Sequence, residues 1–64
     1  MKRRDLEKYL RSNRCEPARD RGPHEVWRNT QTEAIAPVPR HKEIKTYIVA
    51  SICKKLGIPA PDQK

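Results

Sequence analysis

The sequence predicts an α+β domain in which two helices pack on one face of a three-stranded antiparallel sheet. A stretch with helical apolar spacing stands at each end of the chain, and strand-forming residues bounded by Pro and Gly lie between them. Because 64 residues suffice for one domain only, we assign residues 1–59 to it and residues 60–64 to a frayed tail. Hiding both helix faces against one side of the sheet leaves its other side open to water or a partner.

The first helix is predicted over about residues 2–12. Leu6, Tyr9 and Leu10 follow the i, i+3, i+4 spacing of one helix face, and charged residues occupy the other face. Asn13 is expected to end this helix, because Asn tolerates the left-handed conformation that often follows a last turn.

The middle of the chain favours short strands, predicted over residues 15–19, 24–28 and 34–38. Residues 29–32 read as a turn between the second and third strands. Pro17 makes the first strand the weakest, since it removes a ladder donor. Pro37 places the third strand at an edge of the sheet or near its own end.

The last helix is predicted over about residues 42–56. Its apolar residues recur every four positions, at Ile44, Ile48, Ile52 and Leu56. Glu43 in the first turn and two lysines in the last turn would complement the helix dipole. Gly57 is expected to terminate the helix in the left-handed conformation, with Ile58 folding back onto Cys53.

The composition indicates an anionic partner. The chain has 15 Lys and Arg against 8 Asp and Glu, a net charge of +7. Nucleic acid is the first candidate, because cationic side chains bind phosphate and release counterions. A membrane surface or an acidic protein would be attracted by the same charge.

Several classes of protein are not expected from this sequence. The longest nearly apolar run, residues 47–53, is too short to span a bilayer, and no signal-peptide pattern is present, so we expect a cytoplasmic protein. Cys15 and Cys53 match no metal motif and are expected to be reduced and buried. The sequence shows neither a carboxylate cluster for magnesium nor a glycine-rich phosphate loop, so no metal or cofactor is expected.

His24 is the sharpest catalytic candidate. It follows Gly22-Pro23 at the start of a predicted strand, and three arginines lie close in sequence, at Arg19, Arg21 and Arg28. A histidine can move a proton at an RNA 2′-hydroxyl or at the leaving oxygen, while guanidinium groups hold the phosphate. The alternative is a surface histidine on a basic strand, which is the more common case on composition alone.

Two further basic segments and two aromatic residues have alternative interpretations. Arg40, His41 and Lys42 could bind phosphate at the start of the last helix, or they could be a solvated helix start. The run at residues 2–4 has the same two interpretations. Trp27 and Tyr47 could stack on bases, but we expect both in the core because the chain has few large apolar residues.

The order helix, three strands, helix is also that of double-stranded-RNA-binding domains. In order and spacing, the chain resembles HicA-type toxins of type II toxin–antitoxin systems at residues 1–6, 15, 21–27, 38–44 and 52–58. The resemblance implies a metal-independent endoribonuclease that cleaves mRNA, and a HicB-type antitoxin that neutralises it. We expect the toxin to be monomeric outside that complex.

The resemblance also assigns roles to residues. Gly22-Pro23-His24 matches the segment around the family's essential histidine, so His24 is expected to be catalytic. Residues 38–41 match the family's Val-Pro-x-His segment before the last helix. The residues expected to bind RNA phosphates are Lys2, Arg3, Arg4, Arg21, Arg28, Arg40, His41 and Lys42. A non-catalytic RNA-binding module, or an inactivated toxin that still binds its antitoxin, is the rival hypothesis.

Three positions depart from the family pattern. Pro23 stands before the histidine where a non-proline residue is usual, and Arg14 stands after the first helix where Gly is common. Pro17 and Ala18 replace apolar strand residues. The first two departures alter backbone freedom beside the expected site, and the third predicts a weaker first strand and core.

Overall fold

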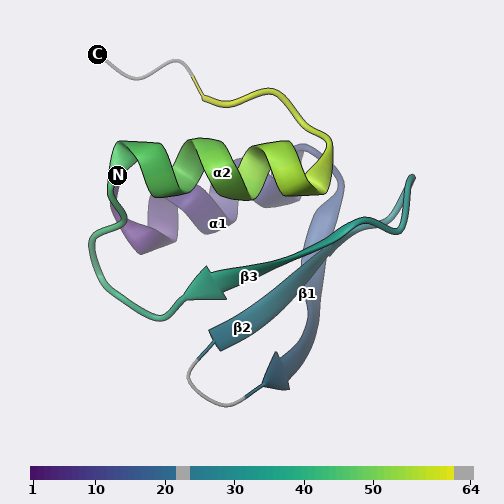
Figure 1. Ribbon diagram of the computed structural model, residues 1–64, viewed down its shortest axis with the longest axis horizontal. Coiled ribbons are helices and arrows are strands. Elements are labelled where there is room, and N and C mark those ends of the chain that lie inside the picture. The colour runs from purple at the N-terminus through teal and green to yellow at the C-terminus, as the bar shows by residue number, and fades with distance from the viewer. Residues whose placement is uncertain (22–23, 62–64) are drawn as a thin grey trace.

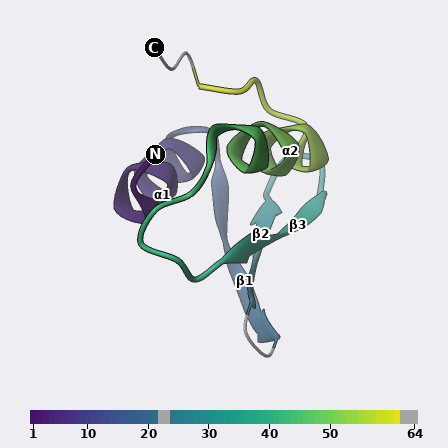
Figure 2. The same ribbon diagram turned by 60° about the vertical axis from the view of Figure 1, so that its left-hand side comes forward.

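The observed architecture is the predicted one. The computed structural model describes residues 1–21 and 24–61, and it describes only the backbone of residues 19–21 and 24. Within these residues the elements are α1 (Arg3–Ser12), β1 (Cys15–Arg21), β2 (His24–Asn29), β3 (Ile35–Pro39) and α2 (Thr46–Leu56). The strands form an antiparallel sheet in the order β1-β2-β3, and both helices lie on one side of it (Figure 1, Figure 2).

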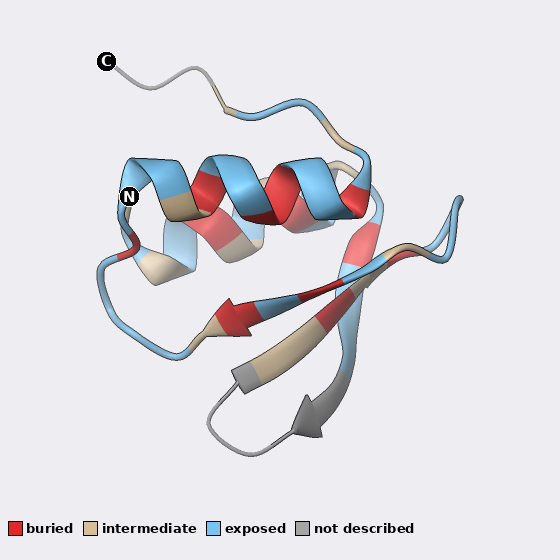
Figure 3. Cartoon of the chain, viewed as in Figure 1, coloured by how far each residue is buried: buried red, intermediate tan, exposed pale blue. Residues whose placement is uncertain are grey.

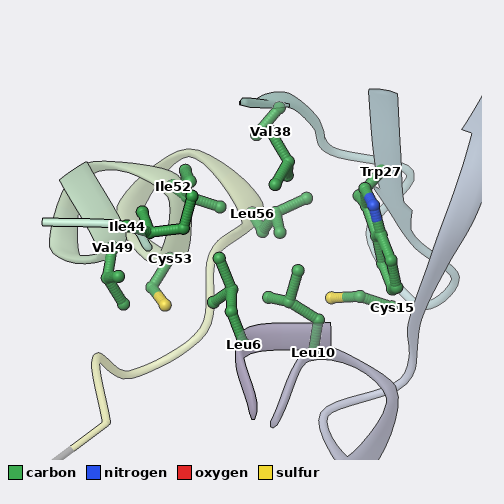
Figure 4. Packing of buried hydrophobic residues seen from close by; sticks show 11 residues of the cluster. Leu6, Leu10, Cys15, Trp27, Val38, Ile44, Val49, Ile52, Cys53 and Leu56 are labelled. Carbon is green, nitrogen blue, oxygen red and sulfur yellow. The ribbon is translucent and has the colours of Figure 1, made fainter. Parts of the chain in front are cut away.

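The core lies between the helices and the sheet. On β3, Ala36 and Val38 are buried while Ile35 and Pro37 are exposed, as expected of a strand with one covered face (Figure 3). Leu6 and Leu10 of α1 point between α2 and the sheet, and Trp27 closes the sheet side (Figure 4). The buried apolar cluster comprises Leu6, Leu10, Cys15, Trp27, Ala36, Val38, Ile44, Val49, Ile52, Cys53 and Leu56.

The chain reverses after α1 one residue later than predicted. Asn13 has φ −106° and ψ 24°, and its side-chain amide donates to the Tyr9 carbonyl at 2.9 Å. Arg14 adopts the left-handed conformation, with φ 65°. Asn13 therefore ends the helix as predicted, but the left-handed conformation that was expected of it is adopted by Arg14 instead.

The sheet accommodates Pro17 through an irregularity in β1. The pairing register between β1 and β2 shifts between Pro17 and Arg19, so Ala18 is the extra residue of a β-bulge. The bulge lets β1 extend to Arg21, beyond the predicted end at residue 19. Gly22 and Pro23, which precede His24, lie outside the described residues.

The segment before α2 is extended, and α2 begins at Thr46 instead of about residue 42. The Ile44 amide donates to the Met1 carbonyl at 2.7 Å, and the Arg3 amide donates to the Lys42 carbonyl at 2.8 Å. These bonds keep residues 42–44 alongside the N-terminal segment, so they cannot also enter the helix. The placement of Glu43 in the first helical turn was wrong for this reason.

The end of α2 confirms the predicted capping motif. Gly57 has φ 74°, and its amide bonds to the Lys54 carbonyl at 3.2 Å. The Ile58 amide donates to the Cys53 carbonyl at 3.0 Å, which completes a Schellman motif. Ile58 packs against the core cluster, and this contact directs the chain away from the helix axis.

Two residues contribute to the core differently from the prediction. Tyr47 is 69% exposed, because the buried face of the shortened α2 carries Val49, Ile52, Cys53 and Leu56. Asn29, expected in a turn, is 3% exposed at the end of β2. Its side-chain amide donates to the Leu56 carbonyl at 2.8 Å and so ties the sheet to the end of α2.

We predict that Arg14→Gly stabilises the fold by about 1 kcal/mol, because Gly adopts a positive φ without the clash of a Cβ. The Arg14 carbonyl accepts bonds from the Thr30 amide and hydroxyl, and both bonds survive the change. For a domain of this size the thermal midpoint should rise by roughly 4–8 °C per kcal/mol, measurable by circular dichroism.

The matched control is Arg14→Ala, which removes the same long side chain but keeps the Cβ. It should give little or no stabilisation. Equal gains from both variants would show that the side chain of Arg14, and not its backbone conformation, limits stability.

Candidate functional site

Basic residues that are far apart in the sequence meet at one end of the domain. Lys2 and Glu43 form an isolated antiparallel bridge, which brings the segment after β3 alongside the start of α1 (Figure 2). An open cleft of about 540 Å³ lies here, with four basic and two acidic side chains among its lining residues Lys2, Arg3, Arg4, Glu7, Lys42 and Glu43. The structure thus unites two basic segments that the sequence analysis considered separately.

The backbone of His24 is linked to the wall of this cleft through Pro39, whose carbonyl accepts a hydrogen bond from the cleft-lining Arg3. His24 is the first residue of β2, and its Cα pairs with Arg21 of β1 and with Pro39 of β3. The chain after Pro39 reaches the cleft at residues 42–43. The side chains of His24 and Arg21 lie outside the described residues, so their expected roles stay predictions.

Arg3 has a set of intramolecular partners that the sequence did not indicate. Its Nη2 lies 2.6 Å from Glu25 Oε1, and its Nη1 donates to the Pro39 carbonyl at 2.8 Å. Its Nε lies 3.2 Å from Glu7 Oε2, and the side chain is only 14% exposed. The guanidinium therefore binds groups of α1, β2 and β3, whereas it was expected to face RNA phosphates.

Glu25 is the functional candidate that sequence reasoning missed. Its Oε1 accepts a second hydrogen bond, from the Trp27 indole Nε1 at 2.7 Å. Trp27 is completely buried, so this bond satisfies a donor that water cannot reach. The only sequence signal was an acidic residue directly after His24 in a basic segment.

The remaining predicted phosphate ligands do not all lie at the cleft. Arg28 is near the other end of β2, where its Nη2 lies 3.2 Å from Glu16 Oε1. Arg40 and His41 are exposed in the extended segment after β3. They precede the first residue of α2, so the argument that a helix N-terminus would bind phosphate here was wrong.

The two cysteines are buried, as predicted. Burial raises the pKa of the Cys15 thiol. Burial also raises the pKa of the Cys53 thiol, with a further contribution from the charge of Cys15. Because the thiolate is the nucleophile, both groups are poor candidates for covalent chemistry.

Among the described residues, no three His, Cys, Asp or Glu side chains form a group that could hold a metal ion. Neither helix in the described part of the chain is long and apolar enough to cross a membrane.

With the fold and the cleft established, a comparison with protein families identifies the class. The family model described as the HicA toxin of bacterial toxin–antitoxin systems matches residues 3–58. The chain belongs to the HicA toxin family, and it is a toxin of a toxin–antitoxin system, with an antitoxin as its implied partner. No significant match was found among curated proteins or among solved structures.

We predict that native protein reacts slowly with iodoacetamide at neutral pH, because both thiols are buried and their raised pKa values disfavour the thiolate. Alkylation followed by mass spectrometry provides the measurement. In denaturant, both cysteines should be modified rapidly. Native alkylation as fast as in denaturant would contradict the buried placement.

Proposed function

We propose that this toxin is a metal-independent endoribonuclease that cleaves mRNA, with His24 as its catalytic residue. The observation that carries the proposal lies at one end of the sheet. Pro39, the Cα partner of His24, accepts a hydrogen bond from Arg3 in the wall of a cleft. The same cleft is also lined by the cations Lys2, Arg4 and Lys42. A proton-transfer group beside a set of phosphate-binding cations is what RNA cleavage without a metal requires.

His24 acts as a general acid or base. Its imidazole takes the proton from a 2′-hydroxyl or gives one to the leaving oxygen, a role for which imidazole is well suited because its neutral form accepts a proton and its cation donates one. When the 2′-oxygen attacks the adjacent phosphorus, negative charge develops on the phosphoryl oxygens. Cationic side chains at the cleft stabilise that charge.

The cations that we propose to bind RNA form two groups, those that line the cleft and those that lie outside it. Lys2, Arg4 and Lys42 are exposed at the cleft and hold the phosphates nearest the scissile bond. Arg40 and His41 continue the basic surface along the neighbouring segment, Arg21 adds to it beside His24, and Arg28 binds RNA further along the sheet. These contacts read the RNA backbone, so they carry little sequence information.

The same surface is the target of the antitoxin, for which we propose a HicB-type protein. Covering the cleft and His24 together would block substrate and catalytic residue in one interface. An acidic partner would match the +7 net charge of the toxin, and the area that it buries would stabilise a small core through mass action.

We predict that His24→Ala abolishes RNA cleavage and growth arrest while the fold survives. Histidine contributes up to roughly four orders of magnitude to rates by proton transfer. Purified toxin should be assayed on mRNA, in excess EDTA, with thermal unfolding of each variant as the check on folding. Chelation should leave the rate unchanged.

The matched control is His41→Ala, which removes the other histidine in the chain from an exposed position after β3. It should weaken RNA binding modestly and retain cleavage. A His24→Ala protein as active as the parent would overturn the assignment, and RNA binding without any cleavage by the parent would favour the non-catalytic module.

We predict that replacing Lys2 and Lys42 together by Gln weakens binding to all RNA sequences alike. For single-stranded RNA it should also reduce the slope of log affinity against log salt, by about 0.7 for each phosphate that the protein no longer neutralises. Fluorescence anisotropy over a salt series measures both quantities.

The control for charge alone is the replacement of Lys54 and Lys55 by Gln, at the far end of α2 from the cleft. This pair lowers the net charge by the same amount but should change the slope less. If both double variants behave alike, binding depends on net charge and not on the cleft.

A further inference from the structure

We propose that Arg3 and Glu25 are positioning residues that fix His24 relative to the phosphate-binding cleft. The inference rests on the proposed function, since it concerns how the chain orients the residue that we take to be catalytic. Arg3, as part of α1, contacts β2, which carries His24, and β3, which pairs with it.

The first contact is made to the residue that follows His24. Arg3 Nη2 donates to Glu25 Oε1 at 2.6 Å, a short charge-assisted bond between α1 and the start of β2. The second contact is made to the residue opposite His24 across the sheet. Arg3 Nη1 donates to the Pro39 carbonyl at 2.8 Å, and Pro39 is the Cα partner of His24 on β3. One planar guanidinium thus bonds to the residue after His24 and to its Cα partner on β3.

The core holds the other side of Glu25. The same Oε1 that accepts from Arg3 also accepts from the fully buried indole of Trp27 at 2.7 Å. The Glu25 side chain is 23% exposed, so its carboxylate is shielded from most competing water. The direction of Glu25 is therefore set by two donors, one from the core and one from α1.

These contacts distinguish Arg3 from its neighbours. Lys2 and Arg4 are exposed, whereas Arg3 is 14% exposed and bears a third contact, from Nε to Glu7 at 3.2 Å. The Arg3 guanidinium donates two hydrogen bonds and lies within ion-pair distance of two carboxylates, so Glu7 and Glu25 already neutralise its charge. Arg3 lies in the wall of the cleft and also contacts β2, the strand that carries the proposed catalytic histidine, so it connects the two.

The consequence concerns rate more than affinity. Displacing a catalytic group by about 1 Å can lower a rate by roughly a hundredfold, while phosphate contacts elsewhere keep the substrate bound. Without the Arg3–Glu25 pair, the start of β2 would lose its tie to α1, and His24 would move relative to RNA that Lys2, Arg4 and Lys42 still hold.

The test compares Glu25→Gln and Arg3→Lys with the parent. Glu25→Gln keeps the side-chain shape and one oxygen acceptor but removes the charge. Arg3→Lys keeps the charge, but a single ammonium lacks the planar fork that reaches two acceptors. For each variant, single-turnover cleavage at saturating RNA gives the rate, anisotropy gives the RNA Kd, and thermal unfolding gives stability.

We expect each variant to lower the single-turnover rate by roughly tenfold or more while the RNA Kd changes by less than about threefold. Because the two residues act through one pair, the double variant should be no slower than the slower single variant. A parental rate in both single variants would overturn the proposal. So would a loss confined to Kd.

Two controls separate positioning from other effects. Glu16→Gln breaks a different arginine–glutamate pair, the one that Glu16 of β1 forms with Arg28 of β2, and should leave the cleavage rate unchanged. Val49→Ala removes buried methyl groups from α2 and should lower the thermal midpoint without lowering the rate of folded protein. If Val49→Ala lowers the rate as much as Glu25→Gln at a matched midpoint, stability explains the loss and the proposal is overturned.

A second readout keeps this inference distinct from the proposed function. If the parent does not cleave RNA, or if His24→Ala cleaves as well as the parent, the proposed function fails. The positioning claim is then decided by the NMR signals of the His24 amide and imidazole. Their displacement in Glu25→Gln and not in Glu16→Gln would support it, and unchanged signals in both would overturn it.

Discussion

The carboxylate of Glu25 joins the core of this protein to its candidate site. One of its oxygens accepts hydrogen bonds from the buried indole of Trp27 and from the guanidinium of Arg3. A buried donor without an acceptor costs roughly 1–3 kcal/mol, and a shielded charge without its partner costs more. Glu25 Oε1 avoids both costs, because it accepts a hydrogen bond from the indole and pairs with the guanidinium. Since Trp27 and Glu25 belong to β2 and Arg3 to α1, this shared acceptor fixes the position of α1 relative to β2. Arg11 of α1 adds to this link by stacking over the Trp27 ring, 5.3 Å from its centroid.

The charge distribution follows from that arrangement. A net charge of +7 on 64 residues is self-repelling, and much of it lies on exposed side chains at the ends of α1 and α2. The ion pairs of Arg3 with Glu7 and Glu25 neutralise the cation nearest the core. In the function that we propose, an anionic substrate and the antitoxin bind the basic surface that remains.

Much of the fold could be predicted, because it depends on local patterns. The helical spacing of Leu6 and Leu10 predicted α1, and the four-residue apolar repeat that ends at Leu56 predicted α2. Gly57 predicted where α2 ends. The start of α2 could not be found in this way, because residues 42–44 are held extended by bonds to the N-terminal segment. The exposure of Tyr47 could not be predicted either, because it depends on where α2 begins.

The sequence by itself determined the residue types of the candidate site: a histidine after Gly-Pro, a basic N-terminal run and a basic segment before the last helix. Only the tertiary structure decided which of these residues meet. Lys2 and Lys42 share a cleft, Arg28 lies elsewhere, and Arg3 turns inward to Glu25 and Pro39. Periodicity reports contacts within a few residues along the chain, whereas these pairings join distant segments whose approach depends on how the helices pack against the sheet.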